Sequence, residues 1–242
     1  MQSNFKENIF KLEQIFQIEI LNKEIFIKAL THGSFTKENE ITFLQNYERL
    51  EFLGDAVLKL CISDILYKKF PKYAEGELTK IRSIVVSDNT LSKIAEKIKL
   101  APLMILGKQE EKMGGRSRSS ILACTFEAVL GAYYLEGKFK EISTFLELTF
   151  EDFIKDVDEN FEKFNAKAIL QEYTQSQNKE IPSYKIVEEI GPQHNKIFVV
   201  EVSYKTEILA SGKGKTKRDA EQACAYEACV KLGAIERVRN EK

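Results

Sequence analysis

The chain has 242 residues, of which 43% are hydrophobic and 30% are charged. This much apolar material excludes a disordered chain, and the length suggests one large domain or two small ones. The 36 basic and 37 acidic residues leave a net charge of −1, which argues against a simple polycationic arm for nucleic acid. No run approaches the roughly 18 apolar residues of a membrane span, and charges within the N-terminal MQSNFKENIFKLEQIF argue against a secretory signal. We therefore expect a cytoplasmic protein that does not enter a membrane.

Apolar residues from about 5 to 155 recur every three or four positions, which predicts a helical region. One such series is Leu50, Leu53, Val57 and Leu60. A charged and weakly apolar stretch at 155–164 then predicts a linker. Helical spacing returns at 166–177, and residue-by-residue alternation begins at Ser183 in YKIVEEI, IFVVEVSY and ILASGKG. Helical spacing resumes at Thr216, so the second region reads as a helix, three strands and a helix.

These periods predict a multidomain chain in which an all-α domain precedes a small α+β domain of order α-β-β-β-α. The predicted boundaries are 1–154 for the first domain, 155–164 for the linker, 165–234 for the second domain and 235–242 for a tail.

Cysteine and histidine are few and scattered. The residues are Cys61, Cys124, Cys224, Cys229, His32 and His194. None of the cysteines shows Cys-x-x-Cys spacing, and the two histidines are far apart in the sequence. We therefore expect reduced thiols rather than a zinc site or a disulfide framework.

The segment NYERLEFLGDAVLKL at 46–60 carries a stripe of acids. Glu48, Glu51 and Asp55 are three and four residues apart, so they share one face of a helix. Glu51 and Asp55 are separated by about 6 Å along the axis, which lets both approach one cation. Like charges at this spacing repel, and a hard divalent cation such as Mg²⁺ would remove the repulsion. On this helix alone, a solvated acidic face remains an equal alternative.

A second candidate acid lies in ILACTFEAVLGAYYLEG at 121–137. Glu127 is the only acid there in an otherwise apolar or small-residue run before Glu136. A buried lone carboxylate is expensive unless it is paired or binds a metal. Three acids on one helix and one on another are the material of a divalent-metal hydrolase site.

Basic residues gather at the start of the last predicted helix. Residues 165–242 hold 13 basic and 11 acidic side chains, which leaves 23 and 26 in 1–164. Much of the positive charge falls on Lys213, Lys215, Lys217 and Arg218, around the predicted N-cap Thr216. Free backbone N–H groups and the helix dipole would add to these charges, which predicts a phosphate-binding helix terminus. A solvated basic face is the alternative.

The segment YERLEFLGDAVL at 47–58 closely resembles the signature of the ribonuclease III family. The segments ALTHGSF at 29–35, AEGELTKIRSIVV at 74–86 and SILACTFEAVLGAYYL at 120–135 agree with it. The C-terminal PSYKIVEEIGPQHNKIFVVEVSY and GKGKTKRDAEQACAYEA resemble a double-stranded-RNA-binding domain. This resemblance implies a homodimeric, Mg²⁺-dependent endoribonuclease of double-stranded RNA that needs no small-molecule cofactor. It also implies products with 5′-phosphate and 3′-hydroxyl ends, and a role in processing structured precursors such as ribosomal RNA.

The resemblance also implies roles for the acids. Glu51 and Glu127 would bind the metal, and Asp55 would help to bind it and position the attacking water. Glu127 and Asp55 would thus be catalytic, together with Glu48, which matches the family's outer acid near the RNA or behind the metal ligands.

Cys124 departs from the family pattern, which usually has an aspartate three residues before the second-helix glutamate. A thiol is a poor ligand for a hard cation and is mostly protonated at neutral pH. Three interpretations remain open. A water could replace the missing ligand, the chain could prefer a softer ion such as Mn²⁺, or it could bind double-stranded RNA with weak or lost cleavage.

By the same resemblance, the second domain would read RNA mainly by shape. Gln171 and Glu172 would face one minor groove and His194 the next, while Lys215, Lys217 and Arg218 would hold the phosphates between them. His32 reads as a structural residue, and Arg116 and Arg118 in GGRSRSS are either phosphate contacts or part of a solvated loop.

Overall fold

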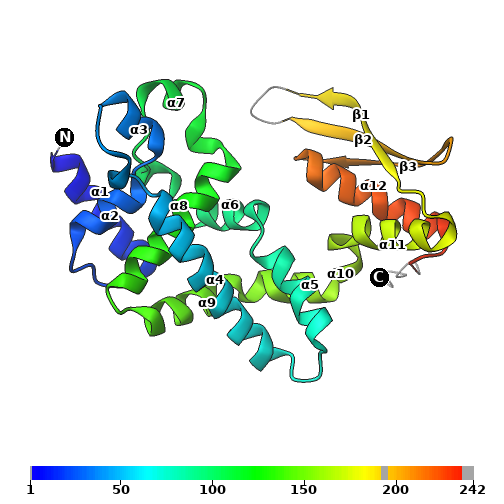
Figure 1. Cartoon of the computed structure of the whole chain (residues 1–242), viewed down its shortest axis with the longest axis horizontal. Helices are drawn as coiled ribbons and strands as arrows, with labels where there is room; N and C mark the ends of the chain where they lie inside the picture. Colours follow the sequence, from blue (N-terminus) through cyan, green and yellow to red (C-terminus); the bar gives the residue numbers. More distant parts are fainter. Residues whose placement is uncertain (1, 192–195, 236–242) are drawn as a thin grey trace. The chain divides into compact units, whose positions relative to one another are not determined.

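The structure is a computed structural model that describes residues 2–191 and 196–235 (Figure 1). The chain divides into two compact units, residues 1–155 and 156–242, and each is described here by itself. In the described part of the chain, no helix combines the length and the apolar character needed to span a membrane.

The first unit is built from helices. Its α-helices are α1 (Gln2–Phe16), α2 (Lys23–Leu30), α3 (Gly33–Glu38), α4 (Glu48–Lys69), α5 (Glu75–Val85), α6 (Asp88–Lys97), α7 (Lys108–Lys112), α8 (Ser119–Leu135) and α9 (Phe139–Glu159). Short 3-10 helices lie between some of them, namely η1 (Phe43–Gln45), η2 (Ala101–Leu103) and η3 (Gly115–Ser117).

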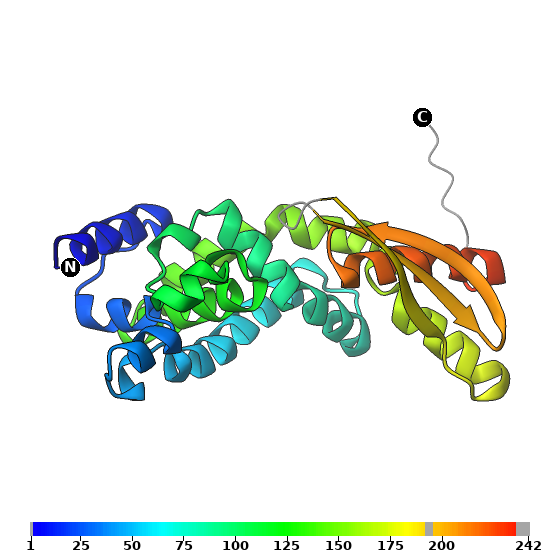
Figure 2. The same cartoon turned by 90° about the horizontal axis from the view of Figure 1, so that it is seen from above.

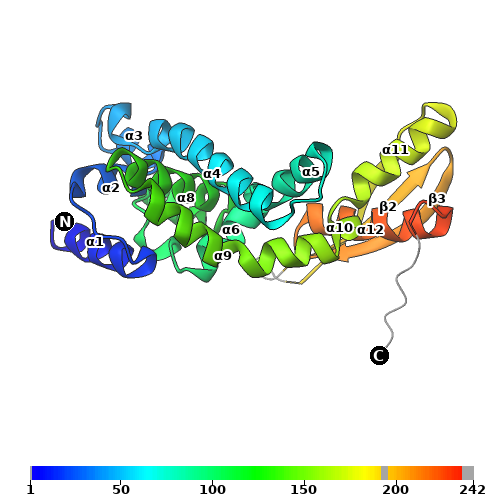
Figure 3. The same cartoon turned by 90° about the horizontal axis from the view of Figure 1, so that it is seen from below.

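Helix α8 is the centre of this unit. Its sequence is apolar on nearly every side, so it buries residues 121–133 with Cys124 alone half-buried in that span. It packs against α2, α4 and α6. Figure 3 shows α4 and α8 side by side, an arrangement that places the two helices carrying the candidate acids next to each other.

The predicted linker at 155–164 is helical over most of its length. Helix α9 continues to Glu159, and α10 (Phe161–Phe164) follows after one residue. The reason is that apolar residues at helical spacing extend into the charged stretch: Phe150, Ile154 and Val157 are fully buried. The charges of this segment therefore mark the solvent side of a helix.

The second unit has the predicted order of elements, and the predicted fold class is confirmed. After α10 it contains α11 (Ala166–Asn178), β1 (Ser183–Ile190), β2 (Ile197–Tyr204), β3 (Glu207–Gly214) and α12 (Lys217–Leu232). The strands form one antiparallel sheet in the order β1-β2-β3. A tight turn joins β2 to β3, with Lys205 at a φ of 57°.

Helix α12 lies against the sheet, as Figure 2 shows. Two glycines of β3 permit this approach: a Cβ at Gly212 would lie 2.3 Å from the Cys224 nitrogen, and a Cβ at Gly214 would lie 2.3 Å from the Ala220 nitrogen. The core between the elements includes Leu170 of α11 and Val202 of β2. His194 lies outside the described residues, so its predicted RNA contact stays a prediction.

Candidate active site

The candidate site lies where α4 crosses α8, and two glycines set the distance between the helices. A Cβ at Gly54 would lie 1.7 Å from the Glu127 carbonyl oxygen, and one at Gly131 would lie 2.3 Å from the Leu50 carbonyl oxygen. No side chain fits at either position, so the two backbones touch directly. Because Gly54 stands beside Asp55 and opposite Glu127, this contact brings the acids of the two helices into one place.

Glu127 is the most buried acid of the site. Only 9% of the residue is exposed, and no hydrogen bond or ion pair of its carboxylate is found within the described residues. Its pKa is raised to about 8, mainly by burial and then by the charges of Asp55, Glu51 and Asp88 in that order, while Lys59 opposes the rise. Glu51, Asp55 and Glu127 therefore repel one another as carboxylates, as the sequence predicts for a cation site.

Asp55 has a basic partner on its own helix. The Lys59 ammonium donates a hydrogen bond of 2.7 Å to Asp55 Oδ2. Both side chains are partly exposed, at 53% for Lys59 and 38% for Asp55, so the pair is in contact with solvent.

The Cys124 thiol is protonated in this environment. Its pKa is raised mainly by burial, and then by a hydrogen bond to Glu51 and by the charges of Glu51, Glu127 and Asp88. A protonated thiol donates to the Glu51 carboxylate and does not ligate a hard cation. Cys124 stands three residues before Glu127 on α8, and its contact is with Glu51.

Glu48 is the first residue of α4. Its backbone N–H donates to the Asn46 side-chain oxygen at 3.0 Å, and a Cβ at Gly33 would lie 3.2 Å from its Oε1. Its charge raises the pKa of His32, and Glu48 and Glu51 both raise the pKa of Tyr47. Glu48 therefore borders both the His32 loop and the surroundings of Glu51.

His32 has the structural role that the sequence predicts. Its Nδ1 accepts a hydrogen bond from the Ser34 N–H at 3.1 Å and caps α3, and its ring meets Tyr47 edge-on. Burial lowers the pKa of His32, although the nearby Glu110 and Glu48 oppose that change.

The arginines of the GGRSRSS segment are engaged within the protein. The Arg116 guanidinium donates to the carbonyl oxygens of Ala101 and Met104 and pairs with Glu111. Arg118 pairs with Glu110 at 2.9 Å. Arg116 therefore connects neighbouring loops, and few of its guanidinium N–H groups are left to bind a phosphate.

The donor chemistry of the site fits a hard divalent cation. The available atoms are the carboxylate oxygens of Glu51, Asp55 and Glu127, and the Lys59 ammonium is a cation that lowers the pKa of Glu127. In the described ranges, no three His, Cys, Asp or Glu side chains are close enough to form a ready-made metal cage. An ion here would complete its coordination with water and phosphate oxygens, as Mg²⁺ commonly does.

Asp88 and Lys59 are members of the site that sequence reasoning missed. The pairing of Lys59 with Asp55 could have been predicted from the sequence, because a lysine four residues after an aspartate can pair with it on a helix. Asp88 is the first residue of α6, and it acts on Cys124 and Glu127 only because α6 packs against α8. No local pattern in the sequence predicts such a contact.

The basic cluster of the second unit has the predicted helix cap. The Thr216 hydroxyl accepts the Asp219 N–H at 3.0 Å. Lys213 and Lys215 are exposed. Lys213 lies in β3 between the two glycines that touch α12, so it points to the other face of the sheet. The Lys217 ammonium lies 5.7 Å from the centre of the Phe198 ring. Arg218, Gln171 and Glu172 are also exposed, which leaves these predicted RNA contacts available.

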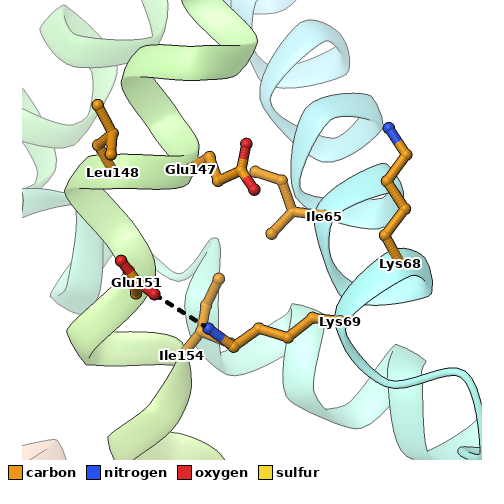
Figure 4. Close-up of a pocket in the computed structure, with 7 residues that line it drawn as sticks. All are labelled: Ile65, Lys68, Lys69, Glu147, Leu148, Glu151 and Ile154. Atoms are coloured by element: carbon orange, nitrogen blue, oxygen red, sulfur yellow. Dashed lines mark ion pairs between the residues drawn. The ribbon is translucent and has the colours of Figure 1, made fainter.

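A pocket between α4 and α9 is separate from the acids (Figure 4). Its lining residues are Ile65, Lys68, Lys69, Glu147, Leu148, Glu151 and Ile154. Lys69 reaches across it to Glu151 at 3.8 Å, whereas Lys68 points away from α9 and pairs with Asp64 at 2.6 Å. Its lysines and glutamates thus offset one another, and it offers no concentrated charge for a substrate.

Comparison with known proteins finds two family models. A model described as Ribonuclease-III-like matches residues 22–152, and one described as Double-stranded RNA binding motif matches 166–232. "Ribonuclease 3" of Bacillus licheniformis is 40% identical over 93% of this chain and 90% of its own length. "Ribonuclease 3" of Natranaerobius thermophilus is 42% identical over 93% of this chain and 96% of its own length.

A solved structure agrees with these relatives. The nuclease domain of ribonuclease III from Campylobacter jejuni, in a structure that concerns a region involved in dimer formation, has a TM-score of 0.55 and 40% identity. The similarity covers 60% of this chain and 96% of that domain.

Proposed function

Because this chain belongs to the ribonuclease III family, we propose that its α4 and α8 carboxylates form the catalytic centre of a metal-dependent enzyme. The chain is an endoribonuclease that acts on double-stranded RNA. The observation that supports the centre best is Glu127, a buried residue whose carboxylate has no hydrogen-bond or ion-pair partner among the described residues and which is close enough to Asp55 and Glu51 to feel their charges. Such an arrangement is costly in a folded protein unless a cation joins it.

Each acid has a distinct part in the proposed chemistry. Glu51 and Glu127 supply oxygens from opposite helices, and Asp55 supplies a third and orients the attacking water. When bound there, a divalent cation lowers the pKa of a water and stabilises charge on the leaving 3′ oxygen. Glu48 contributes toward the RNA.

Cys124 keeps Glu51 in place in this proposal. Its protonated thiol donates to the Glu51 carboxylate, and a water would supply the ligand that an aspartate at this position would otherwise provide. We propose Mg²⁺ as the working ion, since carboxylate and water oxygens suit it, with Mn²⁺ as a substitute.

The second unit would grip the RNA. Lys215, Lys217 and Arg218 lie exposed around the capped start of α12, where side-chain charge and free backbone N–H groups favour phosphate. Gln171 and Glu172 on α11 and His194 would contact the two flanking minor grooves.

We also propose that the enzyme is a homodimer. Phe52, Leu60 and Tyr67 expose 82%, 58% and 74% of their surface on nearby faces of α4. Large apolar side chains exposed in this way mark contact surfaces, and the similar Campylobacter jejuni domain has a region involved in dimer formation. Light scattering should give twice the chain mass for the unmodified protein and the single-chain mass for Phe52→Ser.

The remaining parts of the proposal follow the RNA chemistry. Hydrolysis by a metal-bound water would leave 5′-phosphate and 3′-hydroxyl ends. The substrates would be structured precursors such as ribosomal RNA in the cytoplasm.

A cleavage assay tests the proposed centre. Purified protein is incubated with a labelled RNA duplex over titrations of Mg²⁺ and Mn²⁺, beside Glu127→Gln and the control Glu96→Gln, which removes an exposed acid of α6. We expect Glu127→Gln to lower the rate by at least about 100-fold, the scale of a catalytic group, without weakening duplex binding. An intact duplex with both ions and the unmodified protein would reduce the chain to a binding protein and refute the proposal.

A further inference from the structure

Lys59 is a basic group in direct contact with one of the proposed metal ligands. It donates to one oxygen of Asp55 at 2.7 Å, and it is the group that lowers the pKa of Glu127, against the effects of burial and the neighbouring acids. A lysine in this position partly neutralises carboxylates that the mechanism assigns to a metal.

We propose that Lys59 is a resident counter-ion of the carboxylate site and competes with the divalent cation for Asp55. This inference rests on the proposed metal centre. The Lys59 ammonium is hydrogen-bonded to an Asp55 oxygen that a divalent cation would need as a ligand. The same oxygen cannot bind the cation and accept this hydrogen bond without weakening one of the two interactions.

The exposure of the pair makes such an exchange possible. Ion pairs between partly exposed side chains four residues apart on a helix are weak, because water screens them and two flexible side chains must be held still. With 53% of its side chain exposed, Lys59 can turn away into solvent without leaving a buried charge behind. A divalent ion would also repel the ammonium, so the ion and the Lys59–Asp55 pair exclude each other.

The consequence is a weaker affinity for the metal. Lys59 lowers the affinity of the centre for a divalent cation by competing for Asp55. Cys124 lowers the same affinity because it supplies no carboxylate. Removal of the Lys59 charge should therefore tighten cation binding, even though it removes a hydrogen bond from a proposed ligand.

The test measures ion binding without catalysis. Free Mn²⁺ is followed by electron paramagnetic resonance as full-length protein is titrated at constant ionic strength. The variants are Lys59→Gln, Glu127→Gln and Lys68→Gln. Lys68→Gln is a matched control, because Lys68 forms the same kind of pair with Asp64, at 2.6 Å, lower on the same helix.

We expect Lys59→Gln to lower the Kd for Mn²⁺ by about two- to fivefold, the range of an exposed pair, and Lys68→Gln to leave it unchanged. An unchanged or higher Kd in Lys59→Gln would overturn the inference while leaving the metal centre intact. If Glu127→Gln binds Mn²⁺ as well as the unmodified protein does, the metal centre itself fails, and the role of Lys59 fails with it.

Discussion

The buried carboxylate of Glu127 should make the stability of the protein depend on pH in an unusual direction. Its pKa is about 8 in the folded chain, against an ordinary value of 4.5. Between these two values the unfolded chain holds fewer protons at this residue than the folded chain does. The free energy of unfolding should therefore fall as pH rises through this interval, by about 1.4 kcal/mol per pH unit.

The full interval gives the expected magnitude. With a pKa of 4.5 in the unfolded chain and about 8 in the folded chain, the free energy of unfolding should fall by about 3 to 5 kcal/mol from the lower to the higher pH. This is a large part of the stability of an ordinary domain. Glu127→Gln has nearly the shape of the protonated acid but cannot ionise, so the variant should escape the loss.

The assay is urea denaturation followed by far-ultraviolet circular dichroism at pH 5, 7 and 8.5, with a chelator present. The variant and the unmodified protein should differ little at pH 5, and the variant should be the more stable by several kcal/mol at pH 8.5. Addition of Mg²⁺ at pH 8.5 should stabilise the unmodified protein and leave Glu127→Gln unaffected, since binding to the folded state alone is stabilising. A difference between the two proteins that is the same at every pH would refute the reasoning.

Three further changes test separate parts of the molecule. Gly54→Ala should lower the free energy of unfolding by about 3 kcal/mol or more in thermal denaturation, because its Cβ would meet backbone at 1.7 Å. Gly76→Ala, which has nothing within 4 Å, should be neutral or stabilising by up to about 1 kcal/mol, and equal losses in both variants would contradict the close helix contact. Cys124→Asp should lower the Mg²⁺ concentration for half-maximal cleavage, whereas no change would place residue 124 outside the ligand sphere. Lys217→Ala should reduce the salt slope of duplex-RNA binding by about 1, and an unchanged slope would remove it from the phosphate contacts.

Periodicity predicted the order of elements well, because each pattern is local. The alternation of apolar and polar residues in 183–214 predicted the three strands, and apolar residues spaced three and four apart predicted the helices. The segment at 155–164 has a feature that its charges alone do not predict. Its charges suggested a linker, and the structure shows that most of it is helical, because Val157 continues the buried series of α9.

The acids could be chosen from sequence, but their grouping could not. Helical spacing places Glu48, Glu51 and Asp55 on one face, and it cannot show that Glu48 acts on His32 or that Glu51 and Asp55 act on Glu127 of α8. Those interactions depend on contacts between segments far apart in the chain. The same applies to Asp88, which joins the site from α6.

The direct contact of α4 and α8 backbones at Gly54 and Gly131 has a consequence for how the enzyme tolerates change. Side chains that pack between two helices normally act as spacers, so substitutions among them alter the separation of anything mounted on either helix. Here the main chains of α4 and α8 are in direct contact. The distance between the proposed ligands on the two helices is therefore set by this backbone contact and not by side chains between the helices. Substitutions elsewhere in the core of this unit can then change side-chain volume and lower the stability of the fold, while the geometry of the proposed ion site is retained. Catalysis and thermal robustness would thus vary independently across most of the core, and would be lost together only at the two glycines.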